Sequence, residues 1–292
     1  MTAEQWATYR EILRSHDAGQ TKQTERQLRE LTRESPDFVE AHRSYQDLLL
    51  AEGRLDELVA EYDAGVARAG EDGIALSLRA RLEDDPRKRL ALLRTAEGLS
   101  PGVAWILVAR AHARASLGDL KKALGDLEEA TRLDPRLPEA WLDYGDLSEA
   151  FDRKQAISAY ARYLELRPDE AAISIRLGWL LLQEGRIREA EEVFRRLRTH
   201  SPTFADAAWG LALVAEAEGR FDDCQRWVEE GVTLAPDDPV HEYNLGVCLS
   251  RPGVARPDLA VEALRRYLEK GGERTIRIQN WIERIQAEEV KR

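Results

Sequence analysis

The sequence predicts an all-α protein, a solenoid of stacked helical hairpins, and the main evidence is a period of about 34 residues. Prolines mark this period at intervals of 34, 33, 34 and 34 residues: Pro101, Pro135, Pro168, Pro202 and Pro236. About twelve residues before four of them stand small side chains, Ala123, Ala156, Ala190 and Cys224. Glycines keep the same step at Gly118, Gly185 and Gly219. Units that repeat in this way contact only their neighbours and offer a long surface to a partner, which favours binding over catalysis.

Each period consists of a helix, a turn and a second helix. In residues 171–204, two series of apolar side chains at helical spacing flank a turn at Gly185. Gly178 and Ala190 are small where the two helices would cross, and Phe194 fills the space beside them. The preceding period repeats this pattern with one residue missing from the turn.

These residues and spacings resemble the tetratricopeptide repeat, which places Trp, Leu-Gly, Tyr, Gly, Ala, Phe or Tyr, Ala and Pro at set positions of a repeat of about 34 residues. The resemblance covers nearly the whole chain and implies a right-handed superhelix of about eight hairpins. The hairpins are predicted at residues 5–38, 39–72, 73–102, 103–137, 138–170, 171–204, 205–238 and 239–272. The first three are degenerate, and five clearer repeats begin near residue 103.

The departures from the pattern are local. In the degenerate repeats Gly19 and Gly53 keep their place, but Thr24 and Leu58 replace the small residue of the second helix. In the eighth hairpin, residues 251–257 lengthen the turn by about two residues.

The last segment, residues 275–292, predicts an amphipathic helix with one apolar face, formed by Ile278, Trp281, Ile282 and Ile285. The last repeat of a solenoid has no neighbour, so we expect this helix to cap it. The predicted domains are a solenoid over residues 1–272 and a capping helix over residues 273–292, with no linker between the repeats.

Composition argues against two kinds of partner. The chain has 43 Lys and Arg against 54 Asp and Glu, a net charge of −11. Phosphate binding needs a positive surface, so no nucleic acid is expected. Acidic chains are repelled by anionic membranes, and the sequence has neither a long apolar stretch nor a basic start followed by an apolar run. We therefore expect no membrane insertion and a cytoplasmic location, and 36 arginines against 7 lysines suggest a GC-rich bacterial genome.

No catalytic or metal-binding pattern is apparent. The five histidines are spread over five repeats, and no phosphate loop, nucleophile elbow or His-Glu-x-x-His motif occurs. Asp143 could share a proton with Asp146 or Glu149, but carboxylates at this spacing on an exposed helix are more often solvated. We predict no enzyme activity, no cofactor and no metal. Cys224 and Cys248 are expected to be small core residues; the alternative is a disulfide or a redox switch.

The resemblance implies a binding groove. In the tetratricopeptide family the second, fifth, sixth, ninth and twelfth residues of each first helix point into the concave face. Those positions give the predicted peptide-binding residues Trp105, Leu142, Asp143, Asp146, Ile175, Arg176, Trp179, Trp209, Leu213, Tyr243, Asn244 and Val247. This groove is aromatic with an acidic middle. Trp179 stands out because the repeat pattern asks for no aromatic there; the alternative is packing against the next repeat.

The predicted function is that of a non-enzymatic adaptor, which binds an extended or helical segment of another protein in this groove. Asp143, Asp146 and Glu149 favour a partner with basic residues beside its apolar ones. Two alternatives stay open. One is an architectural scaffold that self-associates as a homo-oligomer, or docks by its ends and convex face. The other is an accessory solenoid subunit of an enzyme.

Overall fold

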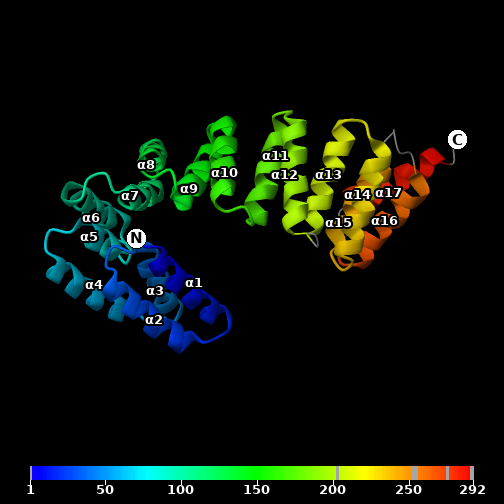
Figure 1. The fold of residues 1–292 in the computed structure, drawn as a ribbon. Helices are drawn as coiled ribbons and strands as arrows, with labels where there is room; N and C mark the ends of the chain where they lie inside the picture. Colours follow the sequence, from blue (N-terminus) through cyan, green and yellow to red (C-terminus); the bar gives the residue numbers. More distant parts are fainter. Residues whose placement is uncertain (1, 202–203, 251–255, 274–275, 290–292) are drawn as a thin grey trace. The chain divides into compact units, whose positions relative to one another are not determined.

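The computed structural model describes residues 2–201, 204–250, 256–273 and 276–289 (Figure 1). Seventeen helices, α1 to α17, occur in these ranges, and no strand is found there. The predicted all-α helical repeat fold is therefore confirmed. Pro202, residues 251–255 of the predicted long turn and Thr275 lie outside the described residues.

The chain divides into two compact units, Met1–Asp152 and Arg153–Arg292. The first unit contains α1 (Ala3–Asp17), α2 (Thr21–Glu34), α3 (Val39–Ala51), α4 (Leu55–Ala69), α5 (Gly73–Ala80), α6 (Pro86–Leu99), α7 (Ala104–Ser116), α8 (Leu120–Leu133) and α9 (Pro138–Glu149). The second unit contains α10 (Arg153–Leu166), α11 (Ala171–Gln183), α12 (Ile187–His200), α13 (Ala205–Ala217), α14 (Phe221–Leu234), α15 (Pro239–Leu249), α16 (Pro257–Glu269) and α17 (Ile276–Glu289). The boundary falls in the turn after α9.

Glycines at the turns explain one series of the sequence repeat. Gly118 follows α7 with a φ of 78°, in the left-handed region that residues with a β-carbon avoid. Its N–H donates to the carbonyl of Ala115, and the next N–H, that of Asp119, donates to the carbonyl of Arg114, both at 2.9 Å. These bonds satisfy carbonyl groups that the end of α7 would otherwise leave unpaired.

Helix caps define the short third repeat. The side chain of Asp72 accepts a hydrogen bond from the N–H of Ile74 at the start of α5. Asp85 accepts one from the N–H of Arg87 at the start of α6. Pro86 is the first residue of α6, where a missing N–H breaks no helical hydrogen bond. Local chemistry therefore fixes these helices although the repeat pattern is degenerate.

The core of the second unit extends into its last helix. Ile278, Ile282 and Ile285 of α17 are buried in one cluster with Leu264 of α16 and Leu249 of α15. The helix therefore covers an apolar flank that the last repeat would otherwise expose, as predicted from the amphipathic pattern.

Both cysteines belong to this core, as expected. Cys224 of α14 and Cys248 of α15 are each 1 % exposed, and their sulfur atoms lie 2.9 Å apart.

Candidate functional site

In the first unit, Trp105 lies in a depression of about 80 Å³ on the side formed by first helices. The walls come from α3, α5, α7 and the start of α6. Side chains from three consecutive predicted repeats therefore meet here. The lining residues besides Trp105 are Val39, Arg43, Ser77, Leu78, Arg81, Arg89, Leu93, Val108, Ala109 and His112. We call the surface formed by Arg43, Arg81, Arg89, Trp105, His112 and Asp143 the Trp105 face.

Arginines surround the tryptophan ring. The guanidinium carbon of Arg43 lies 4.8 Å from the ring centroid of Trp105, a cation–π distance. Arg81 donates to Asp47 at 2.5 Å and to the side-chain carbonyl of Gln46 at 3.0 Å. Arg89 donates to the backbone carbonyl of Glu83 at 2.8 Å. Packing and hydrogen bonds thus hold three cations in place around one aromatic anchor.

His112 extends this face from α7 to α9. Its Nε2 lies 2.7 Å from the carboxylate of Asp143, and about half of the His112 side chain is exposed. Because α9 packs beside α7, the predicted residues Leu142 and Asp146 continue the same surface. Leu142 is half-buried and Asp146 is exposed. The structure therefore brings the four predicted residues of this unit together.

Acidic side chains occupy the amino-terminal ends of α3 and α9. Burial raises the pKa of Glu40, and the nearby carboxylate of Glu139 raises it further, against the opposite effect of Arg43. The Oε2 atom of Glu139 is buried and has no hydrogen-bond partner in the part of the chain that the structure describes. Burial also raises the pKa of Tyr9, whose hydroxyl lies 2.7 Å from that of Ser44. The first-helix side is thus positive around Trp105 and negative at these helix ends.

The arginines around Trp105 were not among the predicted groove residues. The sequence reading assigned no groove residues to the three degenerate repeats, so it missed Arg43 and Arg81 and described the groove as aromatic and acidic. The signal was present, because Arg43 is the fifth residue of α3 and Arg81 is the ninth position counted from the start of α5. The positional rule used for the clearer repeats selects both. Arg89, on the second helix of its repeat, falls outside that rule.

In the second unit, the predicted residues lie on the first helices α11, α13 and α15. Trp179 of α11 is 37 % exposed. Arg176 of the same helix places its guanidinium carbon 5.1 Å from the ring centroid of Tyr160. The remaining predicted residues, Ile175, Trp209, Leu213, Tyr243 and Val247, are half-buried.

Two predicted residues of α15 differ from expectation. Asn244 is only 5 % exposed, so its assignment to an open groove was wrong. Tyr243 packs against Tyr267 and Trp281, with ring centroids 5.6 and 6.2 Å apart. For Tyr243 the cause is that α16 and α17 pack on the last repeat, so that a side chain at a groove position meets protein here.

The described residues contain neither a candidate metal site nor a candidate membrane-spanning helix. No group of three His, Cys, Asp or Glu side chains with described positions could hold a metal ion. Across the same ranges, no helix combines the length and the apolar character needed to span a bilayer.

Sequence comparison identifies repeats in the central part of the chain. Two family models described as tetratricopeptide repeat match it, one at residues 147–203 and 181–242 and the other at residues 108–171. No curated protein gives a sequence match.

Solved structures share the fold. The C-terminal part of a TPR repeat-containing protein from Cytophaga hutchinsonii superposes with a TM-score of 0.62 at 12 % identity, covering 81 % of this chain and 98 % of that one. YrrB, titled a TPR protein with an unusual peptide-binding site, gives 0.50 at 18 % identity, covering 61 % and 92 %. The Cut9–Hcn1 structure of the APC/C gives 0.50 at 14 % identity, covering 91 % and 52 %. At these identities the likeness concerns the fold alone. The family matches show that the chain contains tetratricopeptide repeats over residues 108–242, and the helix pairs and the shared fold agree with this.

Proposed function

We propose that this protein is a non-enzymatic adaptor that binds a segment of another protein on the Trp105 face. The observation that carries the proposal is the depression around Trp105, where an aromatic ring and three positioned arginines come from consecutive repeats. Aromatic and arginine side chains are the residues that most often dominate protein interfaces. YrrB, which has this fold, is described by its title as having a peptide-binding site.

The charges define the partner segment that would fit. An apolar side chain would contact Trp105 and Val108, and acidic groups beside it would meet Arg43. Basic groups would lie toward Asp143 and Asp146 on α9, as the sequence suggested. The segment is therefore extended or helical, apolar at its centre and of mixed charge, and complementary charges would fix its direction on the face.

In the second unit, we extend the proposal to the first-helix residues Ile175, Arg176, Trp179, Trp209, Leu213 and Val247. Trp179 is the anchor in this set because a large aromatic side chain at 37 % exposure leaves apolar surface for a partner. Tyr243 and Asn244 are left out, since both are engaged or buried within the last repeat.

Affinity purification from the native cell, followed by mass spectrometry, tests the proposal. The double variant Trp105→Ala, Arg43→Ala should lose at least one protein that the unchanged chain retains, with affinity reduced about 30-fold or more for a pair of anchor residues. Leu133→Ala is the matched control, because Leu133 is an exposed apolar residue of α8, the second helix of its repeat. This variant should retain that protein. Equal recovery of every protein by the double variant and the control, with helical content preserved, would contradict the proposal.

Self-association is the second candidate, and one exposed side chain favours it. Phe151, in the turn after α9, is 59 % exposed. A scaffold that docks through this turn would show a mass that rises with concentration and returns to the monomer in Phe151→Ser. A monomer at every concentration would argue against it.

A further inference from the structure

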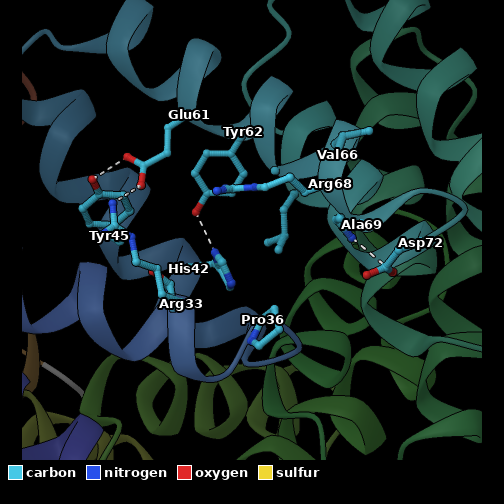
Figure 2. A pocket seen from close by; sticks show the side chains of 14 residues that line it. Arg33, Pro36, His42, Tyr45, Glu61, Tyr62, Val66, Arg68, Ala69 and Asp72 are labelled. Carbon is cyan, nitrogen blue, oxygen red and sulfur yellow. Dashed lines mark hydrogen bonds and ion pairs between the residues drawn. The ribbon is translucent and has the colours of Figure 1, made fainter.

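A second cavity lies on the other side of the first unit, between α2 and α4 (Figure 2). Its volume is about 510 Å³, within the usual range of about 300 to 1,000 Å³ for sites that hold small organic molecules. Residues of α3 and α5 also contribute to its walls. Leu58 in the second repeat is fully buried where clearer repeats carry alanine or cysteine.

The walls are aromatic and apolar. Tyr45 and Tyr62 supply two rings, and Val66, Leu78 and small residues of α4 and α5 supply aliphatic surface. Tyr45 and Tyr62 are 1 % and 8 % exposed, so both rings are fixed by the fold. A rigid wall of this kind favours an aromatic or aliphatic group.

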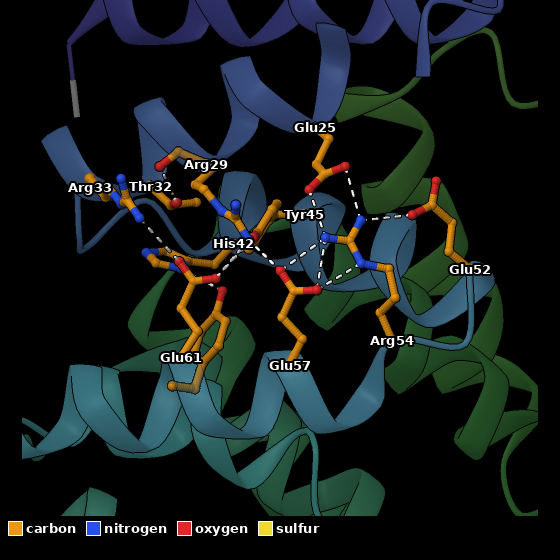
Figure 3. Close-up of polar contacts among 11 residues, drawn as sticks. Glu25, Arg29, Thr32, Arg33, His42, Tyr45, Glu52, Arg54, Glu57 and Glu61 are labelled. Atoms are coloured by element: carbon orange, nitrogen blue, oxygen red, sulfur yellow. Dashed lines mark hydrogen bonds and ion pairs between the residues drawn. The ribbon is translucent and has the colours of Figure 1, made fainter. Parts of the chain in front are cut away.

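The polar tips of both rings are already satisfied by the protein. The hydroxyl of Tyr45 donates to Glu61 at 2.9 Å and accepts a hydrogen bond from Nε of Arg29 at 2.6 Å (Figure 3). The hydroxyl of Tyr62 lies 2.8 Å from Nδ1 of His42 (Figure 2). These groups shape the cavity without needing a ligand.

The two acids of the lining are also engaged. Glu61 binds Tyr45 and Arg29, which in turn binds Glu57 at 2.7 Å (Figure 3). Asp72 accepts hydrogen bonds from the N–H groups of Ile74 and Ala75 and so caps α5. Both carboxylates are thus oriented by contacts within the protein.

Two arginines at the mouth are in the opposite situation. Arg68 makes no hydrogen bond or ion pair with any residue whose position the structure describes. Arg33 approaches Glu61 only at 3.9 Å, and its side chain is 71 % exposed. The guanidinium of Arg68 is therefore free to bind an anion, and that of Arg33 is held only by its long contact with Glu61.

From this arrangement we propose that the cavity binds a small organic carboxylate, with its apolar group against Tyr62 and Val66 and its carboxylate held by Arg68 and Arg33. Guanidinium groups bind carboxylates through paired, charge-assisted hydrogen bonds. The cavity is separate from the depression around Trp105, since the two linings share only Leu78. The proposal is thus independent of the adaptor function.

Ligand-detected NMR with the full chain tests this proposal, with 3-phenylpropanoate and hexanoate as probes and 3-phenylpropanamide as the uncharged control. We expect saturable binding of at least one acid and binding of the amide about tenfold weaker, because the amide loses the charge-assisted contacts. Arg68→Gln should weaken acid binding about tenfold without unfolding the protein, since the residue is exposed. Arg26→Gln, an exposed arginine of α2 outside the lining, is the matched control and should bind as the unchanged protein does.

A second variant locates the ligand. Ala69→Trp places a large side chain at the exposed mouth of the cavity and should abolish binding. The proposal is overturned if neither acid binds saturably, if acid and amide bind alike, or if Arg68→Gln and Ala69→Trp leave binding unchanged. It is also overturned if the peptide N-acetyl-Gly-Phe binds through its C-terminal carboxylate and neither small acid binds.

Discussion

Phe194 of α12 lies so close to Gly178 of α11 that a β-carbon on this glycine would meet the ring at 2.3 Å. The ring has no room to withdraw, because a β-carbon on Gly210 of α13 would also lie 2.3 Å from it. Phe194 is fully buried. One aromatic ring therefore sets the spacing of three successive helices in the second unit, and glycine stands where two of them approach it.

Gly178→Ala should destabilise the second unit by about 1 to 3 kcal/mol, the usual cost of overpacking a closed core. This is the reverse of the effect that alanine has in an open helix, where it stabilises by up to about 1 kcal/mol. Gly125→Ala in α8, where nothing lies within 4 Å of the added carbon, is the matched control and should be neutral or stabilising. Urea unfolding measures both. Adding Phe194→Leu to Gly178→Ala should recover part of the loss, and the same loss in both glycine variants would refute the packing account.

Asp126 of α8 holds two arginines of α7 inside the first unit. Its side chain is 5 % exposed and accepts hydrogen bonds from Arg110 at 2.7 Å, and it pairs with Arg114 at 2.5 Å. Asp126→Ala should lower the free energy of unfolding by about 3 to 5 kcal/mol, because Arg110 and Arg114 would stay largely buried after losing this carboxylate. Glu129→Ala breaks an exposed pair with Arg132 and should leave the free energy of unfolding nearly unchanged, because solvent screens this pair. Similar values for the two variants would show that Asp126 is not a buried structural anion.

His42 should make the first unit less stable in mild acid. Burial lowers the pKa of this imidazole to about 4, below its ordinary value near 6.5. The unfolded chain therefore binds a proton as the pH falls below 6.5, while the folded chain binds it only near 4, so stability is lost as the pH falls through this window. Between pH 7 and pH 5 the loss is about 2 kcal/mol.

Urea unfolding at the two pH values measures this loss, and an NMR titration of the His42 ring gives its pKa directly. In His42→Gln this part of the pH dependence should disappear, whereas His16→Gln, at an exposed site, should retain it. A ring that titrates near 6.5 in the folded protein would contradict the assignment.

The two cysteines should form a disulfide when an oxidant reaches them. Their sulfur atoms are 2.9 Å apart, and burial shields both thiols. Diamide would accept the two hydrogens that the thiols lose, and the bond would join α14 to α15. Peptide mapping should show this crosslink forming slowly, and Cys248→Ser should prevent it. Two unlinked thiols after prolonged oxidation, with the fold intact, would show that the side chains cannot reach bonding geometry.

The helix pairs were predictable because their determinants are local. Gly118 at a turn, Pro86 at a helix start and the Ile278 face of the last helix each act through a few neighbouring residues. Likewise, Gly178 and Phe194 could be placed at a helix crossing from the repeat pattern alone. Such features repeat with the period, so the sequence displays them several times.

The candidate sites were less predictable because they depend on contacts between repeats. Arg43 of α3 contacts Trp105 of α7, and three helices lie between them in the sequence, in degenerate repeats that hid the position of Arg43. Tyr243 obeys the positional rule, yet it packs against Tyr267 of α16 and Trp281 of α17. The cavity beside Tyr62 has no sequence motif, because it arises from the way helices are spaced around a few large side chains.

Photo-crosslinking in the native cell tests the binding face most directly. Benzoylphenylalanine placed at Asp146, an exposed position on α9 beside the Trp105 face, should crosslink another protein, and adding Trp105→Ala should abolish the product. The same probe placed at Leu133, on the second helix α8, should give no such product. Crosslinks to other proteins from Leu133 alone, or an Asp146 product that persists without Trp105, would contradict the assignment of the binding face.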